Sequence, residues 1–156
     1  MEYDVDVYLL SSKFINDYPL SKYPELMYKH GRPYSCLLID THHDYFICVP
    51  YRSSINHKNA FMFNKTQRSR RTRSGLDYSK IVLIKDNDYI DSQKAIVDQD
   101  EYKETMTHLS TIVSDVDQYI NTYVAHVDGS QTLHPREYAR KYQFSTLPYF
   151  HDILNI

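Results

Sequence analysis

The chain has 156 residues, of which 42% are hydrophobic, so it can form one domain with a real core but not two ordinary domains. Its 20 acidic and 18 basic residues give a formal net charge of -2, which excludes a protein that is basic throughout. Local clusters of charge must therefore decide whether the chain binds a polyanion. Sixteen tyrosines and no tryptophan are unusual, and a tyrosine ring can stack on a nucleic-acid base as well as fill a core.

The first third of the chain predicts β-strands. Apolar residues alternate with polar ones from Tyr3 to Leu10, which is typical of a half-buried strand. Residues 11–31 are interrupted by prolines and predict a loop with a short helical piece at Glu25–Lys29. Ser35–Asp40 and Tyr45–Tyr51 are rich in β-forming residues and flank a polar stretch, so they predict a hairpin.

The remainder predicts two more strands and then helices. The strands are Asn59–Asn64 and Lys80–Lys85, and the polar segment 65–75 between them lacks apolar periodicity and predicts a loop. Hydrophobic residues then recur at steps of three and four from Tyr102 to Val127, which predicts one long helix. Asp98 and Glu101 resemble a capping pair at the start of this helix, and Gly129 is a suitable stop.

Two shorter helices complete the prediction. Pro135 opens a helix that ends at Tyr142, and Ser145 or Thr146 caps a last helix that ends at Leu154. Strands followed by helices indicate an α+β fold in a single domain, 1–156: a compact, partly closed antiparallel β-barrel-like sheet with flanking helices.

The two cysteines indicate a reducing compartment. Cys36 and Cys48 each lie within an apolar run and are expected to be buried thiols. The N-terminus lacks the basic and apolar regions of a signal peptide, and no apolar run has the length of a membrane span. We therefore expect a cytoplasmic protein with no membrane partner.

The segment 65–75 holds the clearest charge cluster. Arginine forks match phosphate oxygens, and the threonines and serines of this segment add neutral donors. Charge runs are more often solvated surface, but this run stands out in a chain that is acidic overall, which favours phosphate binding. The predicted phosphate ligands are Lys65, Arg68, Arg70, Arg71 and Arg73.

The end of the second hairpin strand carries a second polar cluster. Arg52, Ser53, Ser54, His57 and Lys58 bring a guanidinium, two hydroxyls, an imidazole and an ammonium close together in sequence. RNA cleavage without a metal needs such groups: help in deprotonating the 2′-OH, a proton for the leaving 5′-oxygen, and donors for the charged phosphorane. An ordinary strand-end loop is the alternative interpretation.

No metal site or cofactor is expected. His42, His43 and Asp44 lie on the hairpin turn, where adjacent side chains point to different sides, and exposed turn histidines are the better interpretation. No zinc-protease, phosphate-loop, nucleophile-elbow or Cys-x-x-Cys motif occurs.

Several short motifs, in this order along nearly the whole chain, resemble the ToxN/AbiQ family of toxins from type III toxin–antitoxin systems. Ser11–Phe14 resembles the family's Ser-Ser-Lys-aromatic step after the first strand, and Tyr28 with Arg32 resembles its Tyr-x-x-x-Lys/Arg element. Val49–Ser53 resembles the Ala-Pro-Leu-Thr-Ser strand end. Three further segments resemble the CptN branch: Arg73–Ile81, Ala95–Tyr102 and Phe144–Phe150.

This resemblance implies a metal-independent endoribonuclease on a barrel-like sheet with flanking helices, similar to the Kid and MazF toxins. It implies cleavage of cellular or phage RNA by 2′-OH attack, which leaves 2′,3′-cyclic phosphate ends, and a role in phage defence. The implied partner is a repeated antitoxin RNA that folds as a pseudoknot, inhibits the toxin and assembles with it into a closed hetero-oligomer.

The resemblance also assigns residues. Ser53 takes the central hydroxyl position, and Tyr28 and Arg32 flank the scissile phosphate. Phe14 stands where the ToxN branch has a tyrosine, and Arg52 stands where it has a threonine beside the serine. Arg52 and Ser54 are further candidates for catalysis, with Ser53 and Ser54 as alternatives at the phosphate. His57 is a catalytic candidate from its acid–base chemistry and not from the resemblance. Lys13, Lys58 and Lys80 are predicted to bind RNA in addition to the basic segment 65–75.

Two other functions use the same features. A non-catalytic RNA-binding regulatory module would use the basic segment and the tyrosines without needing Ser53. A protein-interaction domain would use the arginines to contact acidic side chains.

Overall fold

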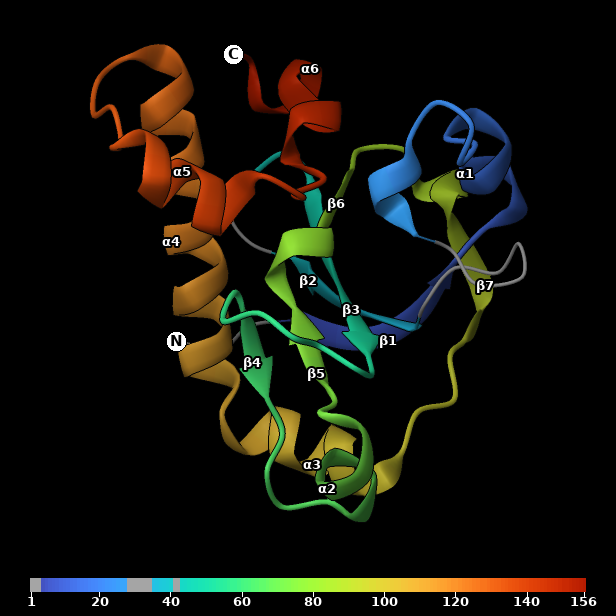
Figure 1. Ribbon diagram of the computed structural model, residues 1–156. Helices are drawn as coiled ribbons and strands as arrows, with labels where there is room; N and C mark the ends of the chain where they lie inside the picture. The colour runs from blue at the N-terminus through green and yellow to red at the C-terminus, as the bar shows by residue number, and fades with distance from the viewer. Residues whose placement is uncertain (1–3, 28–34, 41–42) are drawn as a thin grey trace.

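The computed structural model describes residues 4–27, 35–40 and 43–156 of the chain (Figure 1). The strands are β1 Asp4–Leu10, β2 Ser35–Asp40, β3 Phe46–Arg52, β4 Ala60–Met62, β5 Gly75–Asp77, β6 Val82–Ile84 and β7 Ile90–Lys94. The α-helices are α1 Ser12–Asp17, α2 Gln67–Thr72, α3 Gln99–Thr107, α4 Leu109–Asp128, α5 Pro135–Tyr142 and α6 His151–Leu154. Short 3₁₀ helices are η1 Pro24–Leu26, η2 Tyr78–Lys80, η3 Asn87–Tyr89 and η4 Leu147–Phe150.

The fold is α+β, as predicted, with one seven-stranded sheet in which every pairing is antiparallel. The strand order is β4-β5-β3-β2-β1-β7, and β6 also pairs with β3. The predicted hairpin is confirmed: Cys36 faces Pro50 and Asp40 faces Phe46 in the β2–β3 ladder. β4 and β7 do not pair with each other in the part of the chain that the structure describes, so the sheet is open.

β5 and β6 pair with the same edge of β3, and η2 lies between them along the chain. Leu76 pairs with Tyr51, and Val82 pairs with Cys48. The five residues 77–81 on this edge therefore face only the two residues 49 and 50 of β3. Such insertions bend a strand and re-aim its side chains, and they are common beside active sites. Here Asp77 still pairs with Ala60 of β4, and residues 78–80 leave the ladder as η2 beside the end of β3.

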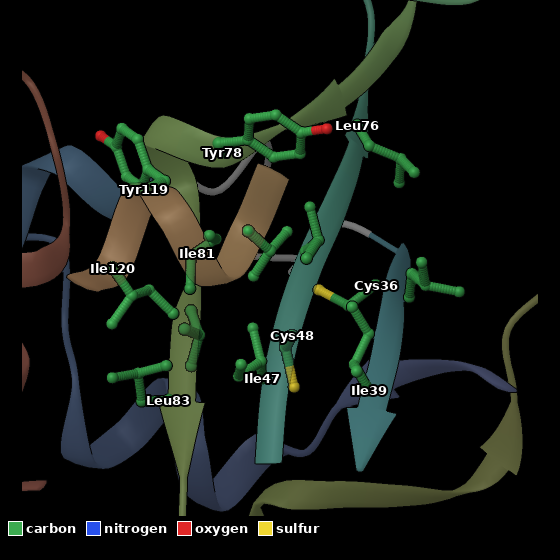
Figure 2. Close-up of a cluster of buried hydrophobic side chains, with 14 of the residues drawn as sticks. Cys36, Ile39, Ile47, Cys48, Leu76, Tyr78, Ile81, Leu83, Tyr119 and Ile120 are labelled. Carbon is green, nitrogen blue, oxygen red and sulfur yellow. The ribbon is translucent and has the colours of Figure 1, made fainter. Parts of the chain in front are cut away.

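The core lies between the sheet and α4 (Figure 2). Ile47 of β3, Leu83 of β6 and Ile120 of α4 are almost fully buried in it. Side chains of this size each contribute about 1.5–3 kcal/mol when they leave water. The predicted apolar stripe of α4 is confirmed in part: Val113, Val116, Ile120 and Tyr123 are buried, whereas Val127 is exposed. Ile112 and Tyr119 are buried as well.

The prediction of buried thiols is confirmed. Cys36 and Cys48 lie on β2 and β3 with at most 3% of their surface exposed. Burial raises the pKa of the Cys36 thiol to about 12 and raises that of Cys48 well above its ordinary value. Both side chains therefore act as small apolar groups in the core.

The prediction of one long helix from Tyr102 to Val127 is wrong, because the helix breaks at His108 into α3 and α4. The hydroxyls of Thr105 and Thr107 donate to carbonyls one turn earlier, which bends a helix. The His108 N–H is then shared between two carbonyls, at 3.2 Å each. The predicted ends hold: Asp98 caps α3 and Gly129, at φ 83°, ends α4.

The prediction of a loop over residues 65–75 is also wrong, since residues 67–72 form α2. Thr66 and Ser69 make a reciprocal capping box, which satisfies donors that the start of a helix leaves unpaired. Arg70 and Arg71 lie in the last turn, where the helix dipole favours positive charge. Local capping thus forms a helix where no apolar periodicity exists.

The predictions for the remaining helices agree with the structure in part. α5 has the predicted bounds. The predicted last helix consists of η4 and α6, and Ser145 accepts a hydrogen bond from the Leu147 N–H. α1, β5 and β7 are additional elements; the residues 28–29 of the predicted Glu25–Lys29 helical piece lie outside the described part of the chain, and η1 covers its start.

Gly75 is required by the close approach of β4 to β5. A Cβ at this position would overlap the carbonyl oxygen of Phe61 and lie 3.1 Å from the Cα of Met62. Because both neighbours are backbone, we expect Gly75→Ala to lower the free energy of unfolding by about 1–3 kcal/mol in urea denaturation. Gly129→Asn is the control, since nothing lies within 4 Å there and asparagine tolerates a positive φ. Equal stabilities of the two variants would contradict this packing.

Candidate active site and nucleic-acid interface

A buried carboxylate, Asp77, lies at the centre of the site. Its side chain is fully buried, and its Oδ2 lies 2.6 Å from Nη1 of Arg52, the last residue of β3. Its Oδ1 accepts hydrogen bonds from the backbone N–H of Ser79 at 3.0 Å and the Ser79 hydroxyl at 2.6 Å. Nε2 of His57 lies 3.2 Å from the same oxygen. The strand insertion at residues 77–81 is what brings this carboxylate to the end of β3.

The surroundings of Asp77 keep it ionised. Burial disfavours the charged form, but the hydrogen bonds from His57 and Ser79, together with the positive charge of Arg52, outweigh burial and hold the pKa of Asp77 below its ordinary value of 3.8. A buried carboxylate of this kind costs free energy unless it is paired and hydrogen-bonded. Asp77 therefore holds the side chains of Arg52, His57 and Ser79 in position, and they in turn stabilise its charge.

Both ring nitrogens of His57 have partners. Nδ1 accepts the backbone N–H of Asn59 at 3.1 Å, so the proton of the neutral ring lies on Nε2, which donates to Asp77. Ser79 Oγ lies 3.3 Å from the same Nε2 and donates its proton to Asp77. In a Ser–His–Asp triad, by contrast, the serine and the carboxylate occupy opposite ring nitrogens. This arrangement orients His57 but does not make Ser79 a nucleophile.

The turn after β3 presents the two predicted serines. Ser53 is partly exposed, and Ser54 is exposed with a left-handed backbone at φ 57°. A non-glycine residue in this conformation is strained and is held by its surroundings. The Ser54 N–H donates to the carbonyl of Thr72, and the Ile55 N–H donates to that of Arg73 at 3.1 Å. The strand-end cluster (residues 52–58) and the basic segment (residues 65–75) were predicted from separate parts of the sequence. They are thus bonded to each other.

The side chain of Arg73 strengthens this connection. Its Nε donates to the Ile55 carbonyl at 2.9 Å, and its backbone takes the left-handed conformation, at φ 50°, that ends α2. Arg70 and Arg71, on the preceding turn, are exposed. The helix that carries these exposed arginines is therefore bonded, through its C-terminal end, to the turn that carries Ser53 and Ser54.

Acids of α3 hold the basic segment in place. Glu101, fully buried, lies 2.6 Å from Nη1 of Arg68 and accepts the Ser74 hydroxyl at 2.5 Å. Glu104 accepts the backbone N–H groups of Asn64 and Lys65. Arg68, Arg70 and Arg71 are all exposed, and Arg68 is the one of these three that is held in an ion pair with the buried Glu101.

Two of the predicted RNA-binding lysines lie elsewhere. Lys80 is 5% exposed, and its Nζ lies 2.8 Å from Glu25 Oε1 and 2.7 Å from the Phe144 carbonyl oxygen, so it ties η1 and the C-terminal segment to the core. Lys13, on α1, pairs with Asp86 at 2.7 Å. Figure 1 places α1 away from α2. The structure brings neither ammonium to the strand-end cluster.

The other predicted residues are two exposed lysines and two residues that the structure does not describe. Lys58 is exposed in the loop between β3 and β4, and Lys65 is exposed just before α2. Tyr28 and Arg32 lie outside the described residues. Sequence reasoning missed Asp77 and Ser79 as site residues. Their signal is an acid followed two residues later by a serine, the pattern of a common turn, and it does not reveal burial.

Comparison with known protein families, characterised proteins and solved structures finds no match to this chain. Within the described ranges, no three histidine, cysteine or acidic side chains gather as metal ligands. None of the helices described here has the length and apolar character needed to cross a membrane.

We expect Asp77→Asn to lower the free energy of unfolding by about 3 kcal/mol at neutral pH, because it leaves the largely buried Arg52 charge without its carboxylate. Since the pKa of Asp77 is lowered by folding, the contribution is complete above 3.8 and is lost as pH falls from there. The stability difference between wild type and variant should therefore shrink below about pH 4. Asp44→Asn, which breaks an exposed pair with Lys85, is the control and should cost less than about 1 kcal/mol. A pH-independent difference would contradict the role of the Asp77 charge.

Proposed function

We propose that this chain is a metal-independent endoribonuclease toxin of the type III kind, with its active centre at the end of β3. The observation that carries the proposal is the bonding of the Ser53–Ser54 turn to the end of α2. The turn carries two hydroxyls, it follows the guanidinium of Arg52, and it is bonded to the helix with the exposed arginines. These are the groups that phosphodiester transesterification requires.

In the proposed reaction, the 2′-oxygen attacks phosphorus and gives up its proton. The bond from phosphorus to the 5′-oxygen breaks, and that oxygen takes a proton. The products are a 2′,3′-cyclic phosphate and a 5′-hydroxyl. No water is consumed, and the proposed reaction needs no metal ion. Ser53 or Ser54 positions the 2′-OH or donates to a non-bridging oxygen, and Arg52, oriented by Asp77, stabilises the phosphorane.

The antitoxin partner belongs to the same proposal. A repeated pseudoknot RNA would inhibit by occupying the surface of Arg70, Arg71 and Arg73, in a closed assembly of toxin and RNA. The similarity of the sheet to the barrel of the Kid and MazF toxins is likewise proposed. It is supported by the antiparallel pairing throughout and by the split of one edge of β3 between β5 and β6.

One observation favours a second candidate, a non-catalytic RNA-binding module. Because Asn59 and Asp77 occupy both ring nitrogens of His57, this histidine does not offer a nitrogen for proton transfer in the described arrangement. A binding module would use the same arginines and leave bound RNA intact.

The test of catalysis uses protein freed of co-purified RNA, incubated with mixed RNA in EDTA, with the 3′ ends analysed. We expect cyclic phosphate ends, and a rate lowered about 10²- to 10³-fold by Ser53→Ala or by Ser54→Ala, according to which hydroxyl faces the phosphate. Ser92→Ala, an exposed serine on β7, is the matched control. RNA that stays bound but intact would support the binding module, and cleavage lost in EDTA would contradict the metal-independent reaction.

The role of α2 has a separate test. If Arg70 and Arg71 contact phosphates, Arg70→Gln/Arg71→Gln should reduce the slope of log affinity against log salt concentration by about 1.4, which is about 0.7 for each phosphate contact on a single strand. The control is Lys85→Gln/Arg136→Gln, which removes the same charge from exposed sites away from α2. A slope equal to that of the control would remove α2 from the RNA surface.

A further inference from the structure

A basic hollow lies between α5 and the loop that joins β3 to β4. It has a volume of about 420 Å³, within the range of roughly 300–1,000 Å³ that is typical of small-ligand sites. The loop forms one wall and α5 forms the other. The lining residues are His57, Lys58, Asn59, Glu137, Arg140 and Lys141.

The charges of this hollow favour an anion. Lys58, Arg140 and Lys141 are cationic, and Glu137 is the one carboxylate among the lining residues. The Glu137–Lys141 pair, at 3.7 Å, is partly exposed on both sides and therefore holds the lysine only weakly. An arginine beside two lysines matches the oxygens of successive phosphates.

Hydrogen bonds hold the two walls of the hollow together. The Asn59 side-chain amide donates to the carbonyls of Arg140 at 3.0 Å and Lys141 at 3.4 Å, and the Tyr119 hydroxyl donates to the latter carbonyl at 2.9 Å. These bonds fix the last turn of α5 against the loop. They also occupy carbonyls at the negative end of the helix, which would otherwise repel an anion.

The same loop connects this hollow to the proposed active centre. Ser54, near its start, is bonded to the end of α2, and Asn59, at its end, is bonded to α5. The two residues are five positions apart along the chain, so their Cα atoms lie at most about 18 Å apart. His57 lines the hollow and also binds Asp77. Figure 1 shows the loop between β3 and β4 crossing in front of β5, with α5 and α2 on either side of it.

A cavity beside α3 lacks these features. Its charged lining residues balance, with Lys65 and Lys103 against Asp100 and Glu104. The Glu104 carboxylate there already accepts backbone N–H groups of the segment before α2. This cavity supports α2 and has no excess of positive charge for a phosphate.

We propose that the hollow between the β3–β4 loop and α5 is a second RNA-backbone subsite, which binds phosphates of the single strand on one side of the scissile bond. α2 holds the strand at one end of the loop, and Lys58, Arg140 and Lys141 hold it at the other. This inference deepens the proposed function and rests on it for the position of the scissile bond. The ligand is single-stranded RNA, recognised by its phosphates and not by its sequence.

The test measures binding of the full chain to a mixed-sequence RNA oligonucleotide whose 2′-O-methyl groups prevent 2′-OH attack. We expect Arg140→Gln/Lys141→Gln to reduce the slope of log affinity against log salt concentration by about 1.4 relative to wild type. The matched control, Lys85→Gln/Arg136→Gln, removes equal charge, with Arg136 on α5 but outside the hollow, and should keep the wild-type slope. Thermal unfolding confirms that each variant is folded.

The outcomes separate the two proposals. A variant slope equal to that of the control overturns the subsite, even if wild type cleaves ordinary RNA. The expected change in slope, together with ordinary RNA left intact by wild type, supports the subsite and contradicts the nuclease. Absence of RNA binding by wild type overturns both.

Discussion

The ion pair between Asp77 and Arg52 is the constraint on which the rest of the site depends. A fully buried carboxylate is stable only if it is matched by charge and hydrogen bonds, and Arg52, Ser79 and His57 supply them. The insertion of residues 77–81 into one edge of the sheet is what places the carboxylate there. The same contacts therefore hold two side chains against one carboxylate: the guanidinium at the end of β3 and the imidazole of the loop that follows it.

A second pair of acids organises the basic surface. Glu101 and Glu104 of α3 bind Arg68 and the backbone at the start of the basic segment. These two acids thus hold the segment that contains α2, whose end is bonded to the Ser54 turn and whose Arg70 and Arg71 are exposed. Protein-interaction and RNA-binding functions would both use such a surface. The turn of Ser53 and Ser54 and the basic hollow beside α5 favour RNA over an acidic protein as the partner.

The parts of this structure with apolar periodicity were predictable from the sequence, and the parts held by polar contacts were not. The β2–β3 hairpin and the stripe of α4 follow from apolar spacing, and the end of α4 follows from Gly129. α2 was missed because a capping box and an ion pair, not apolar spacing, stabilise it. Lys80 and Asp77 have ordinary surface residue types, and only the tertiary contacts of Glu25 and Arg52 explain their burial. Sequence reasoning predicted Ser53 and the arginines but not Asp77, the carboxylate that binds Arg52 and His57.

The central claim is that Asp77 acts on RNA through Arg52. The most direct test is a double-mutant cycle on single-turnover RNA cleavage with Arg52→Gln, Asp77→Asn and the double variant, each first shown to be folded. Residues that act as one unit lose their effect together, so the account predicts a double variant about as slow as the slower single variant. Rate losses that multiply, or an unimpaired Asp77→Asn variant, would contradict it.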